Sequence, residues 1–239
     1  MSWLARLFRP HVELPTGYVD RVEAWKNLPG ISEKMPLDQA RFLVVDVETS
    51  GLDVRKDRLL SIGAVAVEAR RLRAGENFES ILRREEVSER ENILIHGIGP
   101  QVQAAGKPPE ESLMKFLEFI GKIPLVAFHA GFDQAMLDRN LRETLGVRLP
   151  NAWIDLAHLA PALLPEAQLP RAGLDDWLSY FGLRAHARHR AVDDAMATGE
   201  LFLILLQRAL ADGLDTVSSL HIVAQAHERK VLGNGMGGA

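Results

Sequence analysis

The segment at residues 41–52 constrains the fold of this chain more than any other. Residues 42–45 form an unbroken apolar run rich in β-branched side chains, which is typical of a strand covered on both faces. Asp46 and Glu48 follow at a spacing of two, so an extended backbone places both carboxylates on one face. Residues 49–51 then predict a turn, which puts the two acids at the carboxyl end of the strand, where α/β sheets bind their ligands.

Two carboxylates held this close repel each other and need compensation. A shared proton, an arginine, or one or two divalent cations would supply it. The alternative is a strand that ends in solvent, with both acids on the surface. Short Asp-x-Glu pairs are common, so this segment alone leaves both interpretations open.

The hydrophobic periodicity predicts a mixed α/β fold. Three strands follow one another without an intervening helix, which favours an antiparallel meander, and short apolar strands then alternate with helices. The predicted strands span 42–45, 59–67, 78–82, 125–128 and 152–154. The predicted helices begin near 108, 132, 155 and 174, and the last is a long helix over 191–211. We therefore expect a mixed sheet with helices on its faces.

The chain is predicted to divide into a central domain at 41–212 and two appendages. Residues 1–40 form a helical extension, in which Val19, Val22, Trp25 and Leu28 recur at helical spacing and are best explained by core packing. The amphipathic start could instead lie on a membrane surface. Residues 213–239 are predicted to be a tail with a disordered glycine-rich end.

Composition excludes several classes of function. The chain has no cysteine, which rules out disulfides, thiolate metal sites and cysteine nucleophiles. A net charge of −4 provides no global positive field, so a polyanion would be held by a local patch or by metals. No apolar run has the length of a membrane span, and the start is too short for a signal peptide. We expect a cytoplasmic protein without an integral membrane segment.

A metal site at the first strand would need further oxygen ligands, and two later acids are placed to supply them. Asp133 lies where a buried strand turns at Gly131 into a helix. Asp194 lies in the first turns of the long helix, just after His189, and Asp193 competes with it for the same role. Each acid near a helix start has an alternative role as a cap or a partner of the helix dipole.

Together these residues resemble the three motifs of the DnaQ-like, DEDDh-type 3′→5′ exonucleases, the superfamily that includes the proofreading subunit of bacterial replicases. The matching segments are Asp46-Val47-Glu48-Thr49, His129-Ala130-Gly131-Phe132-Asp133 and His189-Arg190-Ala191-Val192-Asp193-Asp194-Ala195. The register of the third motif selects Asp194 over Asp193. A further family feature matches His96-Gly97-Ile98, with Glu91 upstream, whereas Ala130 and Gly99 depart from the residues common in relatives.

The resemblance implies a ribonuclease H-like mixed five-stranded sheet and a two-metal phosphodiester hydrolase. It implies that Asp46 bridges two Mg²⁺ or Mn²⁺ ions, that Glu48 and Asp194 complete the ion carrying the attacking water, and that Asp133 supports the second ion. His189 would be the general base. The expected reaction removes nucleoside 5′-monophosphates from the 3′ ends of single-stranded or frayed DNA.

Substrate contacts are predicted less directly. Thr49, Glu91, His96, Ile98 and Phe132 are candidates for holding the terminal nucleotide. Arg188 and Arg190 belong to a basic loop that could hold the strand backbone or could simply be solvated.

Three alternatives stay open at this point. The substrate could be RNA, as in an RNA-trimming oligoribonuclease, or the chain could be a non-catalytic nucleic-acid-binding scaffold with this fold. A metal-free hydrolase using paired carboxylates would instead remain active in chelator. A homodimer is possible, and association with a polymerase is undecided.

Overall fold

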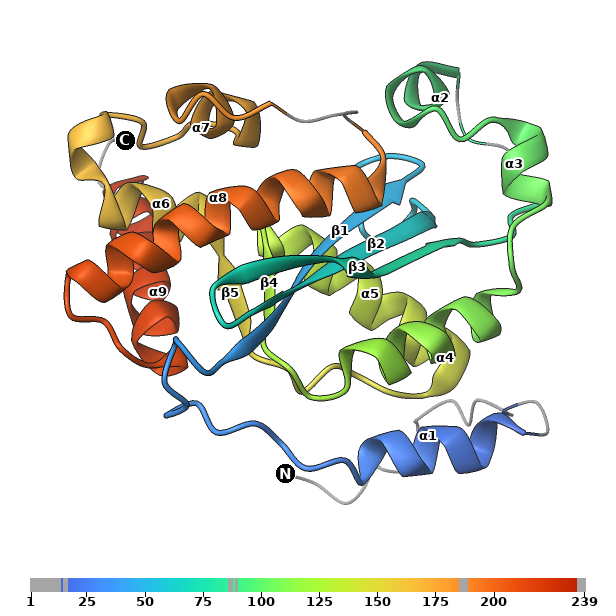
Figure 1. Cartoon of the computed structure of the whole chain (residues 1–239). Helices are drawn as coiled ribbons and strands as arrows, with labels where there is room; N and C mark the ends of the chain where they lie inside the picture. Colours follow the sequence, from blue (N-terminus) through green and yellow to red (C-terminus); the bar gives the residue numbers. More distant parts are fainter. Residues whose placement is uncertain (1–13, 15–16, 86–87, 89, 185–188, 236–239) are drawn as a thin grey trace.

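A five-stranded sheet forms the centre of the computed structural model, which describes residues 14, 17–85, 88, 90–184 and 189–235 (Figure 1). The strands are β1 (Arg41–Thr49), β2 (Leu59–Glu68), β3 (Arg71–Ile81), β4 (Leu125–Ala127) and β5 (Trp153–Asp155). Their order is β3-β2-β1-β4-β5. The first three strands pair antiparallel, and β4 pairs in parallel with both β1 and β5. The predicted mixed sheet is confirmed.

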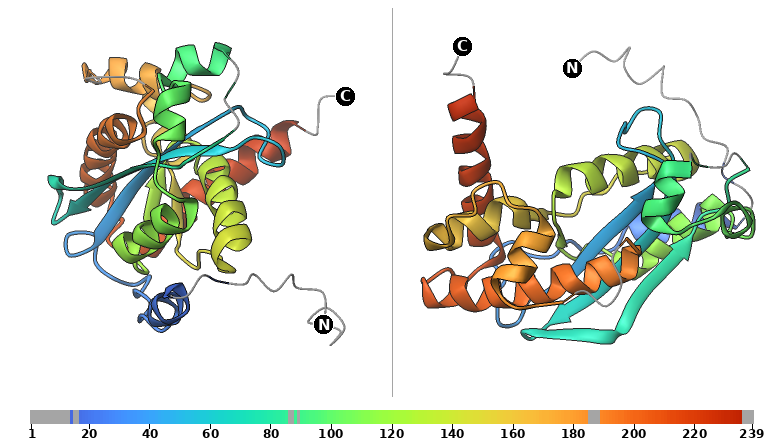
Figure 2. Two further views of the ribbon diagram at one scale, coloured as in Figure 1. Left: turned by 90° about the vertical axis from the view of Figure 1, so that its right-hand side faces the viewer. Right: turned by 90° about the horizontal axis from the view of Figure 1, so that it is seen from above.

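Helices cover both faces of this sheet. The described helices are α1 (Tyr18–Lys26), α2 (Arg90–His96), α3 (Pro100–Ala104), α4 (Pro109–Ile120), α5 (Ala130–Leu145), α6 (Leu156–Leu163), α7 (Leu174–Tyr180), α8 (Ala191–Ala211) and α9 (Val217–Gly235), with a 3₁₀ turn at Pro165–Ala167. Helix α8 runs along β1, β2 and β3 on one face, and α4 and α5 lie on the other (Figures 1 and 2). Among the described helices, none combines the length and the apolar character needed to cross a membrane.

Strand β1 separates two apolar cores by the alternation of its side chains. Phe42 and Val44 pack into the core under α8, and the Phe42 ring meets Phe202 of α8 edge-on at 5.0 Å. Leu43 and Val45 pack into the core formed with α4 and α5. Because the period of a strand is two, Asp46 and Glu48 continue the α8 side of the strand. The carboxylates therefore emerge toward α8.

Two segments differ from the sequence-based expectation within the sheet region. Strand β3 begins at Arg71 rather than near 78, because a register shift after Val65 lets a polar, exposed stretch continue the hairpin. The short helices α2 and α3 were not predicted, since each is too brief for an apolar period to emerge.

The C-terminal segment also differs from the prediction. Residues predicted to form a tail instead form α9, whose Val217, Leu220 and Ala224 are buried against α6 and β5. In addition, the His221 Nδ1 lies 2.9 Å from the carbonyl oxygen of Trp153 in β5. The expected disordered end at 236–239 lies outside the described residues.

The N-terminal extension docks on the central domain through α1. Val22 and Trp25 are buried, as predicted, but Val19 and Leu28 are 49% and 43% exposed. Arg21 of α1 forms a two-point hydrogen-bonded ion pair with Glu118 of α4, with distances of 2.8 and 2.7 Å. Two of the four apolar residues predicted to pack in the core are therefore buried, and the other two are exposed. The amphipathic start at 1–9 lies outside the described residues.

Candidate active site

Three carboxylates converge at the carboxyl end of β1. Asp46 and Glu48 of β1 and Asp194 of α8 each offer an oxygen, and these oxygens lie within 4.8 Å of one another. We call these three residues the acid cluster. Asp194 is buried, and the two strand acids are half-buried. An all-oxygen donor set of this kind suits hard divalent cations such as Mg²⁺ or Mn²⁺.

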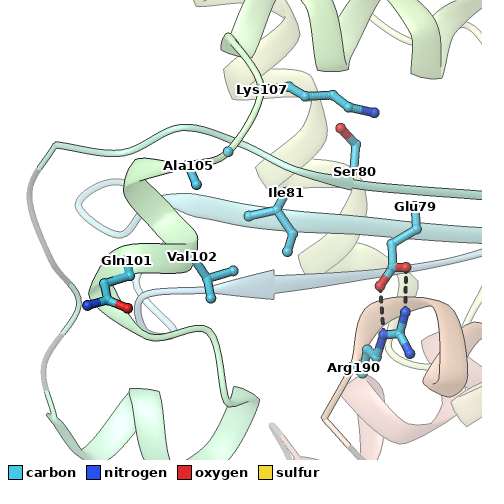
Figure 3. Close-up of a pocket in the computed structure, with 9 residues that line it drawn as sticks. Glu79, Ser80, Ile81, Gln101, Val102, Ala105, Lys107 and Arg190 are labelled. Carbon is cyan, nitrogen blue, oxygen red and sulfur yellow. Dashed lines mark hydrogen bonds and ion pairs between the residues drawn. The ribbon is translucent and has the colours of Figure 1, made fainter.

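The start of α8 reaches the acid cluster because it lies directly across three strands. Asp46, Gly63 and Glu79 stand opposite one another in β1, β2 and β3, so they share one face of the sheet. Gly63 faces the backbone of Ala191 so closely that a Cβ atom would overlap its carbonyl group. Arg190, one residue earlier, forms a two-point ion pair with Glu79 at 2.8 and 2.7 Å (Figure 3).

Substituting Gly63 with alanine tests this close approach. The added methyl group has no room unless the start of α8 moves, so we expect a loss of about 1–3 kcal/mol in the free energy of unfolding. The same movement should lower any activity that depends on the acid cluster. Urea unfolding and an activity assay would measure both effects, with Gly75→Ala as the control because its Cβ would meet open space. Wild-type values for Gly63→Ala would contradict the packing described here.

Asp133, the fourth predicted acid, lies in the first turn of α5 and is buried. Burial raises its pKa well above the usual value, and the negative charges of Asp155 and Glu48 add to the increase. A backbone hydrogen bond from Val47 of β1 acts in the opposite direction. The charged form of Asp133 is therefore unfavourable in the metal-free protein, and a nearby cation would favour it.

Asp155 contributes to this region, although the sequence analysis left it outside the site. Its Oδ1 accepts the backbone N–H of Ala157 at 2.9 Å, which makes Asp155 the N-cap of α6. The same oxygen accepts the N–H of His129 at 3.0 Å, where the backbone is left-handed with φ of 64°. Burial raises the pKa of Asp155. It therefore positions the turn that carries Asp133, and only the parallel pairing of β4 with β5 could have revealed this.

His189, the predicted general base, is exposed and lies two residues before α8. Its backbone is left-handed, with φ of 65°, and its N–H donates to Asp194 Oδ2 at 2.9 Å. This hydrogen bond ties the histidine to the acid cluster. Asp193 instead points to Arg190, with 3.6 Å between the charged atoms.

The predicted substrate contacts occupy different positions around the site. Thr49 donates its hydroxyl hydrogen to the carbonyl oxygen of Gly51 at 2.7 Å. His96 and Ile98 are each 7% exposed, and the His96 Nδ1 accepts the Ile98 N–H at 3.0 Å, so both are fixed inside the fold. Glu91 is exposed on α2, and Phe132 is half-buried in α5.

Two basic residues, Arg188 and Arg190, were predicted to hold the backbone of the nucleic-acid strand. Arg190 is held by Glu79 and Asp193, and Arg188 lies outside the described residues. The roles of all these substrate contacts stay predictions.

Comparison with known proteins agrees with this architecture. A family model described as exonuclease (RNase_T) matches residues 43–202, which include all three motifs. The DNA polymerase III subunit epsilon of Treponema pallidum is 28% identical over 71% of this chain and 78% of its own length. The PolC-type DNA polymerase III of Thermotoga maritima is also 28% identical, over 80% of this chain. The match covers only 14% of that polymerase.

Solved structures extend the comparison to the fold. Escherichia coli exonuclease I in complex with single-stranded DNA superposes with a TM-score of 0.61, at 22% identity, over 71% of this chain and 41% of that protein. The order of the strands and this superposition define a ribonuclease H-like fold. The chain belongs to the exonuclease family, as the match to residues 43–202 shows.

Proposed function

We propose that this protein is a metal-dependent 3′→5′ exonuclease that removes nucleoside 5′-monophosphates from single-stranded or frayed DNA. The observation that carries the proposal is the acid cluster, which gathers carboxylates from β1 and α8 at a distance suited to divalent cations. DNA is favoured over RNA because the similar exonuclease I structures hold DNA oligonucleotides.

Each residue of the candidate active site has its own role in the proposed reaction. Asp46, Glu48, Asp194 and the adjacent Asp133 would hold Mg²⁺ or Mn²⁺, which would neutralise the phosphoryl oxygens and lower the pKa of a bound water. His189 accepts a proton from the attacking water. The oxygen of this water bonds to phosphorus as the bond from phosphorus to the 3′ oxygen of the upstream nucleotide breaks. That 3′ oxygen takes up a proton from solvent, and the terminal nucleoside 5′-monophosphate is released.

A degradation assay with purified protein tests this proposal. A 5′-labelled single strand should shorten from its 3′ end in Mg²⁺ or Mn²⁺ and should stay intact when EDTA removes the metal. Glu48→Gln should abolish shortening, because it removes one negative charge from the acid cluster while keeping the shape of the side chain.

Matched substrates separate the alternatives. A strand with a blocked 3′ end should resist degradation, and faster degradation of the same sequence as RNA would assign the enzyme to RNA trimming. No degradation of any strand would leave a binding scaffold, and activity in EDTA would indicate a metal-free mechanism. Gel filtration, alone and with a replicative polymerase, tests the predicted homodimer and polymerase association.

A further inference from the structure

A cavity of about 560 Å³ opens between β3 and α3 (Figure 3). Its apolar wall includes Ile81 of β3 with Val102 of α3 and the adjacent Ala105. Glu79 and Arg190, joined by their two-point ion pair, line its other side (Figure 3). The volume lies within the range of about 300–1,000 Å³ that is common for small-ligand sites. We call it the upstream cavity.

Strand register connects this cavity to the acid cluster. Glu48 stands opposite Ser61 of β2, and Ser61 stands opposite Ile81 of β3, so the three side chains share one face. Neighbouring strands lie about 4.8 Å apart, which places Ile81 about 10 Å from Glu48 across the sheet. The register shift between β1 and β2 comes after Glu48, and the shift between β2 and β3 lies at Val65, so neither breaks this row. A nucleic-acid strand bound over the acid cluster would therefore reach the cavity within one nucleotide along its backbone.

The wall of the cavity is fixed by backbone contacts. The N–H of Lys107 donates to the carbonyl oxygen of Ile81 at 2.9 Å, and the N–H of Arg83 donates to the carbonyl oxygen of Lys107 at 2.7 Å. Gly106 approaches the backbone of Leu82 so closely that no side chain would fit there. By contrast, the Val102 side chain is 43% exposed. The cavity is therefore preformed, with an apolar surface left open to solvent.

We propose that the upstream cavity binds an unpaired base of the substrate strand, namely the base of the nucleotide whose 3′ oxygen is the leaving group. This inference rests on the proposed function. The flat face of a base would pack on Ile81 and Val102, which requires no particular sequence. A base held in a helical duplex could not enter, so the cavity selects unpaired ends.

Opposite substitutions at Val102 test this assignment. We expect Val102→Asp to raise the KM for a single-stranded oligonucleotide about tenfold and Val102→Phe to lower it several-fold, because stacking on a base is lost or gained. Inhibition by thymidine 5′-monophosphate, which occupies only the terminal position, should stay unchanged in both variants. Ile222→Asp, on the exposed side of α9, places the same charge far from the cavity and should change neither value.

Binding measurements keep this test separate from the test of activity. Fluorescence anisotropy with a labelled oligonucleotide in EDTA should show the same order of affinity, Val102→Phe above wild type above Val102→Asp. If the wild type binds the strand without degrading it, the proposed function fails while the cavity is still tested. Equal KM and affinity in all three proteins would overturn the cavity assignment. A parallel change in thymidine monophosphate inhibition would assign Val102 to the terminal nucleotide instead.

Discussion

Asp133→Asn is expected to stabilise the metal-free protein and at the same time to remove its activity. Burial and two neighbouring carboxylates raise the pKa of Asp133, so folding favours its protonated form. Stability from this group is complete below the unfolded pKa of about 3.9 and is lost as the pH rises through the higher folded pKa. The asparagine amide has no proton to lose, and the variant should therefore resist the decline in stability at neutral pH.

Thermal unfolding in EDTA from pH 5 to pH 8 would measure this difference. We expect the melting temperature of Asp133→Asn to exceed that of the wild type at pH 8 by about 3 °C, a shift that corresponds to about 1 kcal/mol in a protein of this size. Added Mn²⁺ should raise the melting temperature of the wild type more than that of the variant. Nuclease activity should fall by about 10²-fold or more, because a metal ligand is lost.

Asp20→Asn provides the matched control, since Asp20 is exposed on α1. This change should alter neither the pH dependence of unfolding nor the activity. The assignment of Asp133 fails if the metal-free Asp133→Asn protein melts below the wild type across the pH range.

His189→Asn is expected to lower kcat by about 10²-fold or more while the protein still binds its metal. Asparagine removes the imidazole but tolerates the left-handed backbone observed at this position better than most residues do. It also keeps the backbone N–H that donates to Asp194. The loss of rate should therefore report the missing base rather than a displaced loop.

Titration with Mn²⁺ would separate the two explanations. Unchanged Mn²⁺ affinity with a reduced kcat supports the role of His189 as the base, whereas weakened Mn²⁺ binding would show that the residue only maintains the acid cluster. Wild-type kcat in His189→Asn would remove the residue from the mechanism. His189→Ala should lose at least as much rate, because alanine adds backbone strain at a positive φ.

The sequence predicted the sheet and the two acids of β1 because both depend on local patterns. The apolar run of β1 ends in two acids at a spacing of two, and a strand of any register presents these on one face. Asp194 follows His189 at a fixed distance along one helix start. That Asp194 meets the acids of β1 was implied by the resemblance of the three motifs to the exonuclease family, because local spacing does not show how distant segments pair.

The features that the sequence did not reveal depend on pairing between distant strands. Gly63 matters because it stands opposite Asp46 and beneath Ala191, which no local pattern encodes. Asp155 reaches the turn before Asp133 only because β5 lies beside β4. Helix α9 was missed for a similar reason, since its buried residues are few and are defined by α6 and β5.

The position of α8 across β1, β2 and β3 also determines when the protein can act during its own synthesis. Asp46 and Asp194 are separated by about 150 residues, yet they belong to one cluster. A nascent chain that still holds α8 inside the ribosome has its strands but lacks Asp194 and His189. Such a chain cannot assemble the cluster, which therefore forms only after α8 has left the ribosome.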